Sequence, residues 1–309
     1  MNYSKEPEAF HEFELLGWES AVDQYHDGWG NLTSQAVRPL LDALNLGTTS
    51  KLLDVASGPG YVAEEATARG CSVIGLDFSA NMVKKARAVH PGLEFRIGDA
   101  QSLPFEDETF DAVSMNFGML HLANPEVAMK EALRVLKREG CFAFTVWAPP
   151  EEALGFGAIL RAVEKYGESV TVPHGPDFFF NSKPEECKIA LTTVGYLAPK
   201  VMLIDLCWRL ASANEFFPAF YGGTARTGGL LRRRPPEARR RIEEEVRQTV
   251  EEYRAKRRFN RDSYASCTCV GKQGLIITLI VQRGRASLYW HCRSMRQRDS
   301  SMAGRGPSL

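Results

Sequence analysis

Short apolar segments alternate with amphipathic ones between residues 51 and 147, and this alternation limits the folds that the chain can adopt. Buried strands are short apolar runs, whereas helices repeat apolar residues about every 3.6 positions. The expected strands cover residues 51–57, 72–76, 93–97, 110–116 and 141–147, and the expected helices cover residues 61–69, 80–90 and 125–136. Strands and helices that alternate in this way indicate a parallel sheet covered by helices on both faces.

The segments on either side of this core are less regular. Residues 11–46 are predicted to form two helices, and residues after 150 to form helices at 185–193 and 237–256 and strands at 200–210 and 264–270. The expected divisions are an N-terminal helical cover at 1–46, a Rossmann-like core at 47–150, a substrate cap with the last strands at 151–273, and a poorly ordered tail at 274–309.

A glycine turn, Gly58-Pro59-Gly60, follows the first expected strand. Such a turn lets the backbone approach a ligand closely and places a helix N-terminus behind it. Dinucleotide-dependent dehydrogenases use the same device, so the turn alone does not identify the ligand. Asp54, four residues before Gly58, would repel a pyrophosphate and attract an ammonium or sulfonium group.

Two further carboxylates follow the next two expected strands. Asp77 can accept hydrogen bonds from two ribose hydroxyls; its alternative role is to cap the next helix, which Ser79 could do instead. Asp99 can accept from an adenine amino group, and Ala100 offers its backbone N–H to the ring. Three acids at successive strand ends therefore indicate an adenosyl site that contains no phosphate.

The segments LLDVASGPG (52–60), GLDFS (75–79), GDAQSLPFEDETFD (98–111) and EALRVLKREG (131–140) resemble the class I S-adenosylmethionine-dependent methyltransferases. The likeness is greatest to the ubiquinone/menaquinone-biosynthesis type, the methyltransferase type 11/25 domain, and its relatives that modify small natural products. It covers about residues 15–273 and departs from the usual pattern at Arg138-Glu139-Gly140, where relatives have proline before the glycine. The resemblance implies S-adenosyl-L-methionine as the cofactor and a seven-stranded, mostly parallel sheet of order 3-2-1-4-5-7-6.

The resemblance also implies roles for individual residues. Those implied to bind the cofactor are Tyr25, Asp54, Ala56, Gly58, Gly60, Asp77, Phe78, Met82, Asp99, Ala100 and Asn116. Of these, Tyr25 would close over the methionine end and Asn116 would lie at the centre of the site. Methyl transfer needs mainly alignment, and a general base is required only for a poorly acidic acceptor. His121, after the fourth expected strand, and Asn116 are the candidate catalytic groups, although a lone histidine is more often structural.

The region 148–262 is rich in phenylalanine and is expected to cover the acceptor. Trp18, Phe179, Tyr221 and Arg226 are the candidate acceptor-binding residues, and aromatic side chains favour an apolar acceptor. Gly222-Gly223 and Gly228-Gly229 flank a segment that is either a mobile lid or a flexible connection.

Composition limits the kinds of molecule that the chain is expected to bind. Lysine plus arginine and aspartate plus glutamate number 38 each, so the chain lacks the surplus of cations that nucleic-acid binding needs. The seven cysteines are scattered without metal-ligand spacing, which favours free thiols, no metal site and a cytoplasmic location. Residues 1–14 do not resemble a signal or transit peptide, and no apolar run approaches the length of a membrane span. A monomer and a homodimer are both compatible with the sequence.

The sequence thus predicts a methyltransferase that acts on a small, largely apolar molecule, with a slight preference for a specialised-metabolite intermediate because the cap is long. Three other functions stay open. The first is a non-catalytic S-adenosylmethionine-binding regulatory or partner protein, and the second is a lipid-quinone C-methyltransferase. The third is an NAD-dependent oxidoreductase, which Asp54 and Asp99 disfavour.

Overall fold

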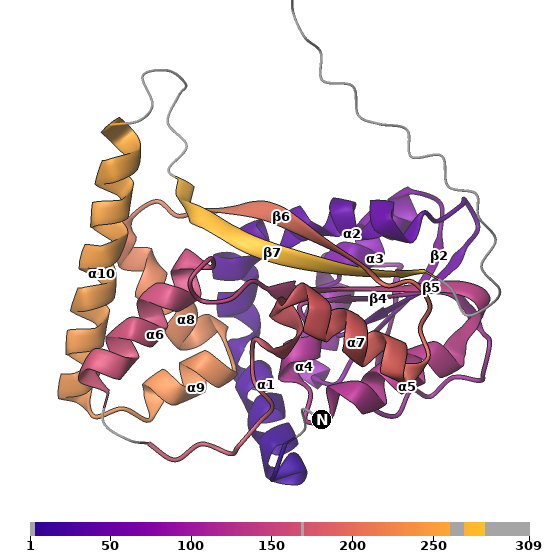
Figure 1. Cartoon of the computed structure of the whole chain (residues 1–309), viewed down its shortest axis with the longest axis horizontal. Helices are drawn as coiled ribbons and strands as arrows, with labels where there is room; N and C mark the ends of the chain where they lie inside the picture. The colour runs from indigo at the N-terminus through magenta and orange to yellow at the C-terminus, as the bar shows by residue number, and fades with distance from the viewer. Residues whose placement is uncertain (1–3, 168–169, 260–268, 282–309) are drawn as a thin grey trace, which may run out of the picture.

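The computed structural model describes residues 4–167, 170–259 and 269–281 (Figure 1). Alternating strands and helices make up the core, and most of the additional helices lie at its edge. The helices are α1 (Pro7–Thr33), α2 (Val37–Leu44), α3 (Tyr61–Ala68), α4 (Ala80–Val89), α5 (Pro125–Val135), α6 (Leu154–Tyr166), α7 (Pro184–Val194), α8 (Phe216–Gly223), α9 (Arg226–Arg232) and α10 (Pro236–Phe259). Four 3-10 turns are η1 (Ser34–Ala36), η2 (Met119–His121), η3 (Phe180–Ser182) and η4 (Ala213–Glu215).

The strands are β1 (Lys51–Val55), β2 (Ser72–Asp77), β3 (Glu94–Ile97), β4 (Phe110–Asn116), β5 (Leu136–Trp147), β6 (Lys200–Arg209) and β7 (Cys269–Val281). They lie in one sheet in the order β3-β2-β1-β4-β5-β7-β6. The first five pair in parallel, so their carboxyl ends meet at one edge. Figure 1 shows α2 on one side of the strands and α5 and α7 on the other. The predicted Rossmann-like α/β fold is confirmed by this arrangement.

The last strand differs from the prediction. β7 begins at Cys269 and continues to Val281, whereas the sequence analysis placed the last strand at 264–270 and a poorly ordered tail from 274. β7 runs antiparallel between β5 and β6, and Leu275 to Val281 pair with Trp147 to Cys141. This apolar stretch is rich in isoleucine and leucine and therefore suits a strand between two neighbours. Residues 264–268 and 282–309 lie outside the described residues.

The N-terminal helix α1 is longer than either helix predicted there, and α2 follows it after a single 3-10 turn. Pro7 occupies a first-turn position, where its missing N–H has no partner to lose. Gly17 lies in the middle of α1 against α9: a Cβ at this position would come within 2.6 Å of the Ala225 Cβ. The absence of a side chain at Gly17 thus lets α1 approach the start of α9 closely.

The glycine-flanked segment predicted to be a lid or a flexible connection joins two helices: Thr224 and Ala225 link α8 to α9, and Arg226 and Thr227 belong to α9. α8 ends with Gly222-Gly223, and Gly228-Gly229 lie inside α9, where both are buried. A Cβ at Gly228 would lie 2.8 Å from the Phe220 carbonyl oxygen, and a Cβ at Gly229 would lie 2.7 Å from the Phe13 ring. The glycines therefore permit close packing, which a composition-based prediction of flexibility does not reveal.

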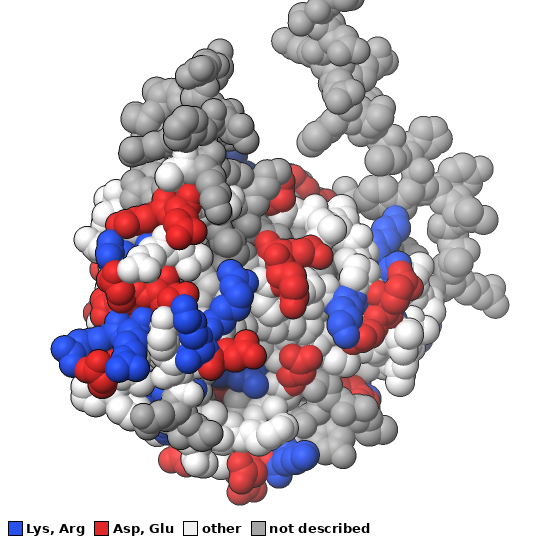
Figure 2. Space-filling model, turned by 60° about the vertical axis from the view of Figure 1, so that its left-hand side comes forward, with Lys and Arg blue, Asp and Glu red and all other residues white. Residues whose placement is uncertain are grey.

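Arginines cluster between residues 232 and 241, but they do not form a uniform basic surface. Figure 2 shows blue and red side chains intermixed where α10 comes forward. Arg240 and Arg241 both pair with Glu237, and Arg247 pairs with Glu244 and Glu251. Within the described residues this face is consequently a mixed ionic surface.

The cysteines only partly match the prediction of free thiols. Cys71, Cys141 and Cys187 are free, whereas Cys207 of β6 is disulfide-bonded. No helix among the described residues is both long and apolar enough to cross a membrane. In the same residues no group of three or more His, Cys, Asp or Glu side chains is placed to hold a metal ion.

Candidate functional site

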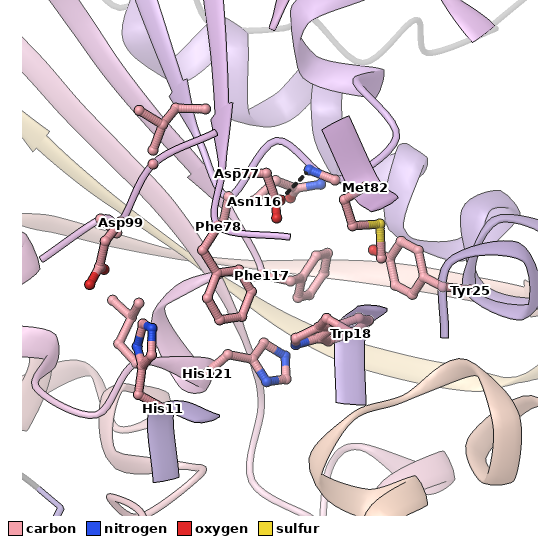
Figure 3. A pocket seen from close by; sticks show the side chains of 17 residues that line it. His11, Trp18, Tyr25, Asp77, Phe78, Met82, Asp99, Asn116, Phe117 and His121 are labelled. Atoms are coloured by element: carbon pink, nitrogen blue, oxygen red, sulfur yellow. Dashed lines mark hydrogen bonds between the residues drawn. The ribbon is translucent and has the colours of Figure 1, made fainter. Parts of the chain in front are cut away.

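A pocket of about 680 Å³ opens at the carboxyl edge of the parallel strands, under α1 (Figure 3). We call it the glycine-turn pocket. Its lining residues are His11, Trp18, Tyr25, Ala56, Gly58, Leu76, Asp77, Phe78, Met82, Gly98, Asp99, Ala100, Asn116, Phe117, Gly118, His121 and Leu122. In Figure 3 Asp77, Phe78 and Phe117 approach it from the strand ends, and His11, Trp18 and His121 lie opposite them.

The loops that form this pocket adopt unusual backbone conformations. Ala56, Gly58 and Phe117 have φ values of 53°, 49° and 59°, in the left-handed region. Only glycine adopts this region without cost, and such strain clusters at functional sites. A Cβ at Gly58 would have no atom within 4 Å, so the turn leaves open space above its backbone. The turn therefore forms a cradle that a ligand can fill.

Asp77 holds the glycine turn in place. Its Oδ2 accepts from the Gly58 N–H at 2.8 Å, and its Oδ1 accepts from the Ser79 N–H at 3.0 Å. Ser79 itself caps α4 by accepting from the Met82 N–H at 3.1 Å. Burial raises the pKa of Asp77 to about 6. Each carboxylate oxygen retains a second lone pair, so Asp77 can bind ribose hydroxyls while it holds the turn.

Asp54 lies beneath the pocket and does not line it. Its side chain is fully buried, Oδ1 accepts from the Ser114 hydroxyl at 2.9 Å, and Oδ2 has no partner among the described residues. Burial, with the charge of Asp77 adding to it, raises the pKa of Asp54 to about 7. A buried carboxyl group with an unused oxygen is costly, and an approaching cation would offset that cost.

The other residues predicted to bind the cofactor differ in how many hydrogen bonds their polar atoms already make within the protein. Asp99 accepts from the Gln101 N–H through one oxygen. The Asn116 amide donates to the Thr33 carbonyl at 3.3 Å and accepts from the Thr145 hydroxyl at 2.7 Å, so it ties β4 to the end of α1. Burial raises the pKa of Tyr25 to about 12, which keeps its phenol neutral.

A second space of about 410 Å³ adjoins the first, and we call it the aromatic pocket. Its lining residues are Trp18, Tyr25, Trp29, Thr33, Phe117, His121, Trp147, Phe156, Phe178, Thr224, Arg226 and Thr227. Phe117 stacks on Trp147 at 4.2 Å between ring centroids, and Phe156 packs on Phe178 at 5.2 Å. Trp18, Tyr25, Phe117 and His121 line both pockets and so mark the boundary between them.

Four predicted residues lie outside both linings. Asp54 is beneath the turn, and Gly60 caps α3 against the Phe95 ring. Phe179 lies behind Phe178, with 5.0 Å between their ring centroids, so Phe178 and not Phe179 lines the aromatic pocket. Tyr221 is directed toward α10, where its hydroxyl accepts from Arg239 at 3.2 Å. A count of aromatic residues in the sequence does not indicate which of two adjacent rings faces the cavity.

Sequence reasoning missed other members of the site. Glu14 of α1 is fully buried, and its Oε2 lies 3.0 Å from Nδ1 of His121. His11, also on α1, packs edge-on against Phe78 with 5.6 Å between centroids. The one available signal was helical spacing: Glu14, Trp18 and Tyr25 recur on one face of the first helix.

Comparison with known proteins supports the motif-based interpretation. Residues 53–144 match the family described as a methyltransferase domain, which confirms the resemblance seen in the sequence. A demethylmenaquinone methyltransferase from Renibacterium salmoninarum is 37% identical over 113 residues, covering 37% of this chain and 48% of that protein. A second, from Streptomyces griseus, is 36% identical over 127 residues, covering 40% and 54%. The chain thus spans about half the length of the curated relatives it matches.

Solved structures support the fold. Phosphoethanolamine N-methyltransferase 2 from Haemonchus contortus, solved with phosphomonomethylethanolamine and S-adenosylhomocysteine, superposes with a TM-score of 0.54. It is 16% identical, and the alignment covers 89% of this chain and 60% of that one. At this identity the likeness establishes a shared α/β architecture and no more.

Proposed function

We propose that this chain, which carries a methyltransferase domain at residues 53–144, transfers a methyl group from S-adenosylmethionine to a small, largely apolar molecule. One observation supports this most: two adjoining pockets share Trp18, Tyr25, Phe117 and His121 as a common wall. The first has carboxylates at strand ends and the second is lined by aromatic rings. A methyl donor in the first and an acceptor in the second would meet at that wall.

The glycine-turn pocket fits S-adenosylmethionine by charge and shape. In this proposal the open space above Gly58 takes the methionine end, and Asp54 lies below it as the counter-charge of the ammonium group. Asp77 accepts from the ribose and Asp99 from the adenine. The cofactor, when bound, supplies an electrophilic methyl group on a sulfonium. The protein holds this group beside neutral rings, and Tyr25 remains protonated there.

The aromatic pocket favours a small apolar acceptor. Its walls are mostly indole and phenyl rings, and Arg226 is the one cation among its lining residues. Such a wall gains free energy by burying apolar surface, whereas a phosphate ester would require more cations than one. We propose a specialised-metabolite intermediate over a lipid quinone, because the pocket is closed in by α6 and α9, which lie beyond the matched domain.

Two measurements test the proposal. Calorimetry should show that S-adenosylhomocysteine binds the full chain and that NAD does not. Methyl transfer from radiolabelled S-adenosylmethionine should then be profiled over phenols, quinols, terpenoid alcohols and alkaloids, with a short-chain demethylmenaquinol included. Absence of S-adenosylhomocysteine binding would overturn the proposal. Binding without transfer to any acceptor would favour a non-catalytic partner protein, and transfer only to histone tails, tRNA or phosphorylated sugars would contradict the acceptor class.

A further inference from the structure

A buried carboxyl–histidine pair lies at the wall between the two pockets. Glu14 of α1 has no exposed surface, and its Oε2 is 3.0 Å from Nδ1 of His121 in η2. Trp18 packs edge-on against the imidazole ring at 4.8 Å, and Phe178 approaches it at 6.1 Å. The ring of His121 is therefore held by a carboxylate and two aromatic neighbours, in a position where it lines both pockets.

The carboxylate determines which ring nitrogen is free. An ionised carboxylate only accepts hydrogen bonds, so Nδ1 of His121 donates to Glu14 when Glu14 is ionised. This tautomer leaves a lone pair on Nε2 when the ring is neutral. Nε2 has no hydrogen-bond partner in the part of the chain that the structure describes. The pair thus has the geometry in which a carboxylate orients a histidine base.

A second polar group lines the aromatic pocket. Nη2 of Arg226 donates to the Pro176 carbonyl at 2.7 Å, whereas Nη1 is buried and has no partner among the described residues. The guanidinium lies over the Phe10 and Phe178 rings at 5.3 and 5.6 Å. Burial lowers the pKa of Arg226, and the nearby charge of Glu14 opposes that shift. A buried N–H donor without a partner is costly and indicates a missing acceptor atom.

We infer that the acceptor is a hydroxylated aromatic molecule whose hydroxyl is methylated on oxygen. His121 Nε2 removes the hydroxyl proton, and the Nη1 of Arg226 binds a second oxygen of the same molecule. Glu14 is a positioning residue that acts through His121. The inference rests on the proposed function and adds to it the reacting atom, the base and the acceptor class.

The hydroxyl proton passes to Nε2 of His121, and a lone pair of that oxygen forms the new O–CH3 bond. The electron pair of the broken S–CH3 bond stays on sulfur, which becomes a neutral thioether. The positive charge of the sulfonium is thereby transferred to the imidazolium, where the Glu14 carboxylate stabilises it.

Several other titratable groups face this pair. His11 and Tyr25 come from α1, Asp77 from β2 and Arg226 from α9. The charge of His121 is among the influences on the pKa of Asp77. A pH profile of the reaction alone would therefore mix several groups, so the test must report directly on the proton of the acceptor.

The first test uses no turnover. The full chain is saturated with S-adenosylhomocysteine and titrated with 4-nitrophenol, whose ionised form has its own absorption band. In the wild-type protein the bound phenol should ionise at a pH lower than in His121→Gln by about one unit or more, which corresponds to about 1.4 kcal/mol. Glu14→Gln should lie between them. Equal ionisation in all three proteins, or no binding of the phenol, would overturn the inference.

The second test compares acceptors of different acidity. For phenol and 1-naphthol, His121→Gln should lower the transfer rate by about 10²- to 10⁴-fold. For 4-nitrophenol, which ionises near neutral pH without help, the loss should be much smaller. His26→Gln, which replaces a histidine on α1 outside both pockets, is the matched control and should leave both rates unchanged. Equal losses for acidic and weakly acidic phenols, or a C-methylated product, would contradict a base acting on the hydroxyl.

Arg226 is tested with two acceptors of similar shape. The wild-type protein should bind 4-hydroxyacetophenone more tightly than 4-ethylphenol, and Arg226→Gln should abolish most of that difference. An undiminished preference would remove Arg226 from the inference. In every variant, S-adenosylhomocysteine binding is measured by calorimetry. If the wild-type protein does not bind S-adenosylhomocysteine, the proposed function itself is overturned. If it binds S-adenosylhomocysteine normally but the phenol experiments give the contrary results, only this inference is overturned.

Discussion

The glycine-turn pocket and the aromatic pocket adjoin each other but are built in different ways. The first takes most of its lining from the ends of consecutive parallel strands and the loops that follow them, with α1 above. The second draws its lining from α1, β5, α6, α9 and the segment before η3. A strand end is fixed by the sheet, whereas the position of a ring on a packed helix depends on every neighbouring helix.

This difference determines what each pocket tolerates. In the glycine-turn pocket the polar groups proposed to bind the ligand are carboxylates and backbone atoms held by short hydrogen bonds, so single changes should act strongly and specifically. In the aromatic pocket many rings share the contact, so single changes should act weakly and on size or shape. Four substitutions or truncations test this difference between the pockets, and the first has the largest expected effect.

The largest effect should come from removing β7. Truncation after Gln273 deletes Gly274 to Val281, which pair with both β5 and β6, and should abolish cooperative folding of the whole chain. Truncation after Val281 is the matched control. Thermal unfolding and S-adenosylhomocysteine calorimetry measure the result. If the shorter protein still binds S-adenosylhomocysteine normally, the glycine-turn pocket folds without β7. The two pockets would then differ because they belong to separately folding domains.

Asp77→Ala should have the next largest effect. It removes a charged acceptor from the ribose and releases the Gly58 and Ser79 N–H groups, each such hydrogen bond contributing about 1.5–3 kcal/mol. Affinity for S-adenosylhomocysteine should fall by well over tenfold in calorimetry. Ser79→Ala, which removes only the cap of α4, should lower stability by about 1 kcal/mol and spare the affinity. Unchanged affinity in the Asp77 variant would refute its assigned role.

Asp54→Asn should have opposite effects on stability and on binding. The pKa of Asp54 rises from 3.8 to about 7 on folding, so its contribution to stability is present at acid pH and is lost as pH rises through that range. The variant should therefore raise the stability of the ligand-free protein at pH 8 by about 1–4 kcal/mol and change little at pH 4. Affinity for S-adenosylhomocysteine should drop at pH 8. Calorimetric unfolding and binding at both pH values test this, and a variant that is less stable at pH 8 would contradict it.

The smallest effects are expected from paired changes in the aromatic wall. Phe178→Ala enlarges the aromatic pocket and should raise the acceptor Michaelis constant about tenfold, at the lower end of the roughly 1.5–3 kcal/mol that burial of a ring contributes. Phe179→Ala, in the ring behind it, should raise this constant less. Neither should weaken S-adenosylhomocysteine. Steady-state kinetics decide between them, and the reverse order would show that Phe179 faces the acceptor after all.

The residues at the strand ends could be predicted from the sequence, whereas several residues of the aromatic pocket could not. Asp77, Asp99 and Asn116 all line the glycine-turn pocket, because each lies at or just after the end of a strand whose apolar pattern is unambiguous. Glu14 was missed because a buried glutamate on an amphipathic helix cannot be told from a solvent-exposed one until its partner is known. That partner, His121, is separated from it by 107 residues. β7 was placed too early because its pairing partners, β5 and β6, are also distant in the sequence.

Trp18, Tyr25, Phe117 and His121 line both pockets, and this shared wall bears on how proteins with this arrangement can diversify. If the two pockets hold the methyl donor and the acceptor as proposed, a mutation in any of these four residues would alter the binding of both molecules, so purifying selection should act on them for two reasons. Trp147, Phe156 and Phe178 line only the aromatic pocket and are free of that double constraint. Among homologues, new acceptor preferences should therefore arise by substitutions on the far wall, while the shared wall changes slowly.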